Sequence, residues 1–369
     1  MLKDSIDRLL AEQYDFESRK RHAALSDGWS RDVWANFAEM GLLTLPFGEE
    51  HGGAVETMII MEAFGRNLVL EPYRSTIVLC GNLLHLGASA VQRATLIPEI
   101  TAGRLLMAFA HSEAQARYDL TDVATTARQD GDSWVLNGAK RHVINGDSAD
   151  KLIVSARVSG DRCNRDGVAL FLVDAKVAGV SRRNYGMQNS WRGADVNLTN
   201  VRVPADALIG TAGEAVPLIE RVVDIAIAAI CMEAVGSMEK ATQITVDYLK
   251  ARKQFGVAIG AFQALQHRAV DMLVAVEQAR SMAMFAAMMA EEPDASERAK
   301  SISAAKVQIG KSGKFIGTQT VQLHGGIGVT EECQASHYYR HLTILETLFG
   351  DTQHHLTRLA NAGGLVRAA

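Results

Sequence analysis

The chain has 369 residues and a formal net charge of −4 at pH 7, from 38 Lys and Arg against 42 Asp and Glu. This length predicts two or three substructures around a sizeable core. The near balance of charge provides no broad basic surface, so we expect no nucleic-acid partner. The apolar run over residues 225–232 is far shorter than a bilayer requires, so we expect no membrane span.

The N-terminus carries acidic residues early and lacks a long apolar block, which predicts a mature start and a cytoplasmic protein. Four cysteines, at positions 80, 163, 231 and 333, are widely separated and have no metal-type spacing. We therefore expect free thiols and no metal site.

The first segment, residues 1–107, is predicted to be a helical domain. Apolar residues recur at three- and four-residue intervals after Ser30, which is a suitable N-cap: Val33, Trp34, Phe37, Met40 and Leu43. Similar stripes follow over residues 56–70 and 75–87. Only six prolines occur in the whole chain, which leaves long uninterrupted helical patterns.

The second segment, residues 108–210, changes to short runs rich in Val and Ile, separated by Gly, Asp and Asn. These runs predict strands. Their spacing, with turns at 130–132 and 145–147, favours antiparallel meanders over strands that alternate with helices. We expect a small antiparallel β-barrel or sandwich.

The third segment, residues 211–369, is predicted to hold four long helices, at about 214–252, 261–291, 294–323 and 332–360. Gly or Pro interrupts the pattern between them. Long amphipathic helices with short connections predict a four-helix bundle. The predicted fold class is mainly α with a central β-domain.

Two strings in the third segment could bind a ligand. In RKQFG, which starts at Arg252, an Arg at a helix end can clamp a phosphate, and the Gly lets the backbone approach it. In QLHGGIG, which starts at Gln322, glycines end a helix. Taken alone, the RKQFG string is better interpreted as a solvated helix end, and QLHGGIG as a C-cap.

The order of helices, β-domain and four helices, with these two strings before the second and the last bundle helix, resembles the flavin-dependent acyl-CoA dehydrogenase family. The likeness covers essentially the whole chain. It implies FAD as the cofactor, an acyl-CoA substrate and an electron-transfer flavoprotein as the acceptor. The implied reaction gives a 2-enoyl-CoA: a carboxylate removes the α-proton of the thioester, and the flavin accepts a hydride.

In this family the flavin lies between two subunits. The resemblance implies that Arg252 contacts the FAD pyrophosphate and Phe255 its adenine side. The adenosine end is implied to meet Gln263 and the turn formed by Gln322, Leu323, His324, Gly325 and Gly326. The neighbouring loop would contribute Asp351 and Gln353.

The β-domain departs from the family pattern. Ser112-Glu113-Ala114 stands where Thr-Glu-Pro is usual, and Arg117-Tyr118 replaces a Gly-Ser pair. His142-Val143-Ile144 replaces Trp-Ile-Thr, and Ile144 cannot donate the hydroxyl hydrogen bond that Thr offers to the flavin edge. Ser112 and His142 are the implied flavin contacts on this side.

The usual base is absent from this sequence. The two positions that carry it in the family are matched here by Phe349 and Ala226, which cannot accept a proton. Asp351 is a weak replacement because it is better read as the N-cap of the following helix. Glu233, about two helical turns from Ala226 on nearly the same face, is better read as a buried structural acid paired with an Arg or a helix end. Asp224 points elsewhere.

The histidines suggest no metal site. His337 and His341 are four residues apart, but Tyr338 stands where a zinc protease motif needs Glu. We interpret both, with His354 and His355, as helix-surface or interface residues.

Three hypotheses follow for function. The pattern looks most like the smaller subunit of heteromeric acyl-CoA dehydrogenases that act on dicarboxylic acyl or steroid side-chain thioesters, which implies an α2β2 heterotetramer with the base on the partner. The second is a self-sufficient homo-oligomer that uses a relocated acid. The third is a non-catalytic structural or acyl-CoA-binding subunit without flavin.

Overall fold

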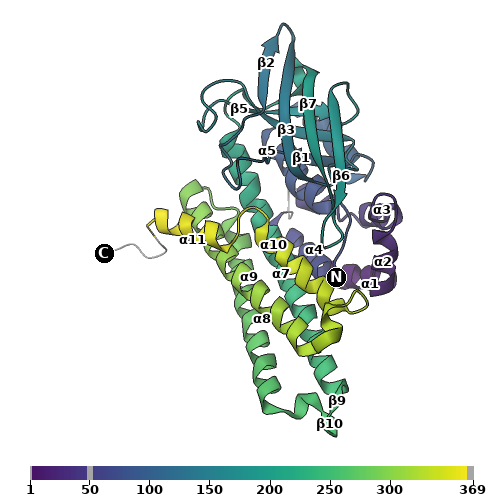
Figure 1. The fold of residues 1–369 in the computed structure, drawn as a ribbon. Helices are drawn as coiled ribbons and strands as arrows, with labels where there is room; N and C mark the ends of the chain where they lie inside the picture. Colours follow the sequence, from purple (N-terminus) through teal and green to yellow (C-terminus); the bar gives the residue numbers. More distant parts are fainter. Residues whose placement is uncertain (1, 48–52, 364–369) are drawn as a thin grey trace. The chain divides into compact units, whose positions relative to one another are not determined.

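The computed structural model describes residues 2–47 and 53–363 (Figure 1). The chain forms two compact units, which we name the helical unit and the sheet unit. The helical unit comprises Met1–Lys20, Gly53–Val69 and Ile227–Ala369, and the sheet unit comprises Arg21–Gly52 and Leu70–Ala226. Both units therefore combine segments that are distant in sequence. The three-segment division at 1–107, 108–210 and 211–369 stays a prediction.

Seven helices build the helical unit within the described residues, and α9 packs against α8, α10 and α11. The predicted fourth helix over 332–360 is wrong: two helices, α10 and α11, replace it. The backbone turns into the left-handed region at Phe349 (φ 57°) and at Gly350 (φ 115°), which ends α10. The helices are α1 (Leu2–Gln13), α4 (Ala54–Asn67), most of α7 (Val216–Ala251), α8 (Gln263–Met289), α9 (Ala295–His324), α10 (Gln334–Thr347) and α11 (Thr352–Asn361).

Two glycines bring the backbones of α4 and α7 into direct contact. A Cβ at Gly65 would lie 1.8 Å from the carbonyl oxygen of Glu233, and one at Gly236 would lie 1.9 Å from that of Glu62. Ser237 donates a hydrogen bond of 2.8 Å to the carbonyl of Gly65. Small residues thus fix the spacing of these two helices.

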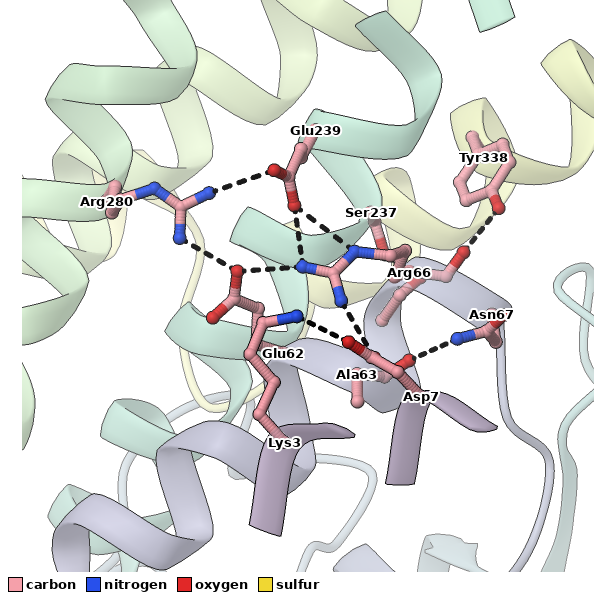
Figure 2. A network of polar contacts seen from close by, with 11 residues as sticks. Lys3, Asp7, Glu62, Ala63, Arg66, Asn67, Ser237, Glu239, Arg280 and Tyr338 are labelled. Atoms are coloured by element: carbon pink, nitrogen blue, oxygen red, sulfur yellow. Dashed lines mark hydrogen bonds and ion pairs between the residues drawn. The ribbon is translucent and has the colours of Figure 1, made fainter. Parts of the chain in front are cut away.

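Arg66 lies at the centre of a polar network that joins four helices (Figure 2). Its guanidinium group contacts Asp7 of α1 at 3.2 Å, Glu62 of α4 at 3.1 Å and Glu239 of α7 at 2.8 Å. Arg280 of α8 contacts Glu62 at 2.8 Å. Because three carboxylates share two guanidinium groups in a half-buried setting, the network orients the helices more than a single surface ion pair would.

Short helices accompany the sheet in the sheet unit. Ser30 caps α3 by accepting a hydrogen bond from the amide of Val33 at 3.3 Å, as predicted. The segment from Arg74 to Gly81 forms a buried π-helix, η2, and runs into α5. The elements are α3 (Arg31–Glu39), η1 (Leu45–Phe47), η2 (Arg74–Gly81), α5 (Asn82–Gly87) and α6 (Ala90–Thr101); α2 (Phe16–Ala23) lies across the boundary between the two units.

An eight-stranded sheet forms the core of the sheet unit, in the order β6-β7-β3-β2-β4-β5-β8 with β1 beside β4. Most pairs are antiparallel, but β1 and β2 pair with β4 in parallel, so the sheet is mixed. The turn at 130–132 joins the paired strands β2 and β3, as predicted. The second predicted turn, at 145–147, lies between β3 and β4, which do not pair with each other. The strands are β1 (Met107–Ala110), β2 (Thr126–Asp130), β3 (Ser133–Ile144), β4 (Lys151–Arg157), β5 (Val168–Asp174), β6 (Val180–Gly186), β7 (Arg192–Pro204) and β8 (Leu208–Ile209).

The predicted fold class, mainly α with a central β-domain, is confirmed. Over residues 2–47 and 53–363, no helix has the length and hydropathy to cross a membrane. In the same part of the chain, no three His, Cys, Asp or Glu side chains gather in a metal-binding arrangement. All four cysteines are free thiols, as expected.

Candidate cofactor site

A groove of about 670 Å³ lies on the helical unit and brings the two sequence strings together. It combines the end of α7 with the end of α9 and the start of α8. Four of the cofactor contacts predicted on the helical unit do not line it: Phe255, Gln263, Asp351 and Gln353. Its lining is Tyr248, Arg252, Gln254, Ile259, Ala264, Leu265, Arg268, Gln322, Leu323, His324, Gly325, Gly326 and Ile327.

Arg252 is placed by a two-residue hairpin between β9 (Lys253–Gln254) and β10 (Val257–Ala258). The tip residues, Phe255 and Gly256, have φ of 54° and 84°, as a type I′ turn requires. The Phe255 side chain is 91% exposed and contacts Phe262 edge-to-face at a ring-centroid distance of 6.1 Å. A bulky aromatic residue thus stands in a left-handed conformation at an exposed tip, where Asn would be more favourable.

Tyr248 and His324 stack on each other beside the glycine turn, with ring centroids 4.5 Å apart. Burial lowers the pKa of His324, so its ring is neutral at pH 7. The Nδ1 atom lies 2.8 Å from the carbonyl of Thr320, which is an acceptor and therefore assigns the proton to Nδ1. The groove thus contains an aromatic pair.

The glycine turn, η5 (Gly325–Val329), leaves its backbone open to a ligand. Gly325 has φ 66°, and added Cβ atoms at Gly325 and Gly326 would meet no atom within 4 Å. Arg268 of α8, which the sequence analysis overlooked, adds a second guanidinium group to the lining and donates to Gln319 at 3.3 Å. Two guanidinium groups beside bare backbone suit a pyrophosphate.

Asp351 is the N-cap of α11, as predicted. Its Oδ1 accepts a hydrogen bond of 2.8 Å from the amide of His354. Phe349 precedes it in the four-residue turn between α10 and α11, and Gln353 is exposed in the first turn of α11. This geometry gives the Asp351 carboxylate a structural role.

Glu233 is fully buried in α7, and its partner is a histidine instead of the Arg or helix end that we predicted. Its Oε1 lies 3.1 Å from Nε2 of His341 in α10. Asp224 and Ala226 are also buried on α7. Glu233 therefore fits the structural interpretation better than that of a free base.

The interpretation of four histidines as helix-surface or interface residues is wrong for three of them, which lie in the interior of the chain's own fold. His337, His341 and His355 are buried, and each has a polar partner. His337 contacts the carbonyl of Glu331 at 3.0 Å and the guanidinium group of Arg19 at 3.3 Å. Partners from elements distant in sequence make this burial favourable.

Ser112 and His142 belong to the sheet unit, whereas the groove residues belong to the helical unit. His142 occupies a bulge of β3 with φ 54°, is exposed, and has Nδ1 3.2 Å from the hydroxyl of Tyr185. The carbonyl of Ser112 accepts a hydrogen bond from the amide of Arg141 at 2.8 Å. Arg141 directly precedes His142, so this backbone hydrogen bond joins the loop that carries Ser112 to the bulge that carries His142.

A buried ion pair holds the Ser112 loop. Lys140 donates to Glu113 at 2.7 Å, to Ser155 at 2.9 Å and to the carbonyl of His111 at 3.2 Å. Burial would raise the pKa of Glu113, but the charge of Lys140 and hydrogen bonds from Lys140, Gln115 and Thr125 lower it to about 2. Burial lowers the pKa of Lys140 to about 8, so both groups are charged at pH 7.

This pair predicts an acid-sensitive contribution to stability. Since the folded pKa of Glu113 lies below its ordinary value of about 4.3, the pair stabilises the fold above that pH and loses this effect as the pH falls toward 2. We expect Glu113→Gln to lower the free energy of unfolding by about 3 kcal/mol at pH 7 and by much less near pH 2. Denaturant titrations across this range measure the difference. Asp130→Asn, in an exposed pair with Arg202, is the control, and equal losses at both pH values would contradict the prediction.

Models of the acyl-CoA dehydrogenase N-terminal, middle and C-terminal domains match residues 1–104, 108–201 and 218–364. The chain therefore belongs to the acyl-CoA dehydrogenase family of oxidoreductases, and acyl-CoA dehydrogenation is its class of reaction.

Similar proteins with acyl-CoA dehydrogenase names agree with this family assignment. The human mitochondrial short-chain specific acyl-CoA dehydrogenase is 30% identical over 342 residues, which cover 89% of this chain and 81% of the relative. A probable acyl-CoA dehydrogenase of Mycobacterium tuberculosis is 32% identical over 333 residues, with coverages of 86% and 83%. A solved variant of the Tcur3481–Tcur3483 steroid ACAD is 26% identical, with a TM-score of 0.87 and coverages of 98% and 96%.

Proposed function

We propose that the chain is one subunit of an FAD-dependent acyl-CoA dehydrogenase, that it supplies half of an FAD site between subunits, and that the partner subunit supplies the base. An electron-transfer flavoprotein is the proposed acceptor. The name of the similar Tcur3481–Tcur3483 steroid ACAD pairs two components, which supports a two-component assembly and a bulky acyl group for this chain.

The groove is the observation that carries the cofactor assignment. Arg252 and Arg268 would bind the two phosphates, the backbone of η5 would approach them, and Tyr248 with His324 offers an aromatic surface. Bound FAD would supply the hydride acceptor of the reaction. Phe255, Gln263, Asp351, Gln353, Ser112 and His142 remain the further proposed contacts.

The assignment of the base to a partner follows from the engaged acids. Phe349 and Ala226 cannot accept a proton, Asp351 caps α11, and Glu233 is paired with His341. Abstraction of the weakly acidic α-proton requires a carboxylate in a site that excludes water. The contacts of Asp351 and Glu233 therefore do not favour either carboxylate as the base that removes the α-proton.

The outer face of α8 supports assembly with a second subunit. Its buried face carries Met272 and Val276 with alanines, as expected for bundle packing. The opposite face also carries exposed apolar side chains, over about 100° of the helix circumference, with Glu277 and Ser281 between them. It exposes Val270, Leu273, Val274, Met284 and Met288. An apolar stripe of this kind on an otherwise packed helix is typical of an interface.

We expect Leu273→Glu to dissociate the assembly, because it replaces an apolar side chain of this stripe with a charge. Light scattering coupled to size-exclusion chromatography measures the mass of the complex. Val91→Glu, at an exposed single apolar residue of α6, is the matched control and leaves the mass unchanged. An assembly of wild-type mass in the Leu273→Glu variant would rule this face out.

Expression alone and with a base-bearing partner dehydrogenase tests the whole proposal. We expect flavin absorbance at about 450 nm and acyl-CoA oxidation only in the co-expressed complex. A yellow homo-oligomer that oxidises acyl-CoA would instead support the self-sufficient enzyme. A complex without flavin would support a non-catalytic subunit.

A further inference from the structure

The turn over residues 348–351 is held by side chains from α9 and α11. Lys306 of α9 is fully buried, and its ammonium group donates to the carbonyls of Leu345 at 2.9 Å and Glu346 at 2.6 Å. These carbonyls belong to the last turn of α10 and have no amide partner further along the helix. A buried cation therefore caps the C-terminal end of α10, where the helix dipole favours positive charge.

His355 of α11 holds the centre of the turn. Its Nε2 lies 3.2 Å from the carbonyl of Phe349, and its Nδ1 lies 3.1 Å from the hydroxyl of Ser303 on α9. Burial and the charge of Lys306 lower the pKa of His355 to about 3, so the ring is neutral and has one N–H. A carbonyl can only accept, so Nε2 donates to Phe349 and Nδ1 is the acceptor of this ring. The single hydroxyl proton of Ser303 is directed either to Nδ1 or to the carbonyl of Ala299, which lies 2.7 Å away.

Further contacts leave little room around this turn. Glu346 accepts a hydrogen bond from the amide of Thr352 at 2.9 Å, which closes the turn from α10 to α11. A Cβ at Gly310 of α9 would lie 2.2 Å from Oγ1 of Thr352, and one at Gly350 would lie 2.6 Å from Nε2 of His355. Ser303, Lys306 and Gly310 are spaced at three and four residues, so one face of α9 meets the turn.

The left-handed conformation of Phe349 needs such support. The left-handed conformation at φ 57° costs a non-glycine residue about 1 kcal/mol or more, and it persists only where the surrounding structure enforces it. The acceptors of these bonds, at Phe349 and at the end of α10, are backbone carbonyls, so the bonds do not depend on which side chain stands at position 349. The turn geometry is therefore built independently of the missing acid.

We propose that Lys306 and His355 are positioning residues that lock this turn and thereby orient Asp351 and Gln353 for the cofactor. The role in cofactor binding rests on the proposed function, whereas the lock itself does not. His355→Leu removes the donor to Phe349, while His355→Gln retains an amide donor. Lys306→Met removes the cap of α10 with little change in side-chain length.

Hydrogen exchange followed by mass spectrometry tests the lock in the full chain without ligand. We expect exchange in peptides spanning residues 348–353 to rise at least tenfold in His355→Leu and Lys306→Met, with α8 unchanged, and to return toward wild type in His355→Gln. Leu359→Ala is the control, because it removes a contact of α11 with the apolar residues Ala304 and Val307 and leaves the polar contacts of the turn intact. Exchange in the turn that stays at the wild-type rate, or rises no more than in Leu359→Ala, would overturn the proposal.

A second measurement addresses the cofactor. We expect FAD to bind about tenfold more weakly to His355→Leu than to His355→Gln in the assembled complex. Equal affinities of these two variants would overturn the positioning role. If the wild-type complex binds no FAD, the proposed function fails, and the exchange data still decide whether the lock exists.

Discussion

Gly65→Ala is expected to lower the free energy of unfolding of the helical unit by about 3 kcal/mol or more. The added methyl group would lie 1.8 Å from the carbonyl oxygen of Glu233 and 2.6 Å from its carbonyl carbon. Both are backbone atoms of α7, so relief requires the helices to separate. That separation would also break the hydrogen bond from Ser237 to Gly65. Thermal and denaturant unfolding followed by circular dichroism measure the loss.

A matched substitution isolates the contact between the helices from the effect of replacing glycine. Gly186 ends β6 in the sheet unit, and an added Cβ there would meet no atom within 4 Å. We expect Gly186→Ala to change stability by less than about 0.5 kcal/mol. Similar stabilities for Gly65→Ala and Gly186→Ala would show that α4 and α7 do not depend on this approach.

Arg252→Ala is expected to weaken FAD binding by about 100-fold, because a charge-assisted bond to phosphate is lost from the groove. Arg252→Lys should recover only part of this loss, since Lys cannot reproduce the planar fork of the guanidinium group. Arg268→Ala is expected to have a smaller effect, about tenfold, because Arg268 also bonds to Gln319. Titration of the cofactor-free complex with FAD, followed by flavin fluorescence, measures the affinities.

Lys253 provides the control for this series. It follows Arg252 directly, is exposed, and has the same charge, but it is not part of the groove lining. Lys253→Ala should bind FAD as the wild type does. A loss of affinity shared by Arg252→Ala and Lys253→Ala would indicate a general effect of charge and would argue against a phosphate contact in the groove.

Local signals in the sequence predicted much of the fold. The N-caps at Ser30 and Asp351 are confirmed, because capping depends on a side chain and an amide only three residues away. The predicted range 332–360 runs across the break between α10 and α11, although an N-cap at Asp351 implies this break. The apolar period continues through Phe349, so periodicity alone does not mark the end of α10.

Properties set by contacts distant in sequence were harder to predict. The parallel pairing of β1 with β4 depends on segments more than forty residues apart, for which hairpin spacing gives no information. The burial of His337, His341 and His355 requires partners such as Arg19 and Glu233 on other helices. Arg268 enters the groove only because the hairpin at Phe255 returns α8 toward the end of α7.

The helical unit is divided in sequence, and this division determines when its helices can pack during synthesis of the chain. Helices α1 and α4 emerge from the ribosome early, but most of the surface that buries them begins at Ile227, after the whole segment Leu70–Ala226 of the sheet unit. Translation adds about 5–20 residues per second, so roughly ten to thirty seconds pass between the synthesis of α4 and that of the segment that begins at Ile227. During this time apolar residues such as Ile6, Leu10 and Phe64 lack their final cover. The order of synthesis therefore leaves these apolar side chains of the nascent chain without their final packing until the segment that begins at Ile227 has emerged.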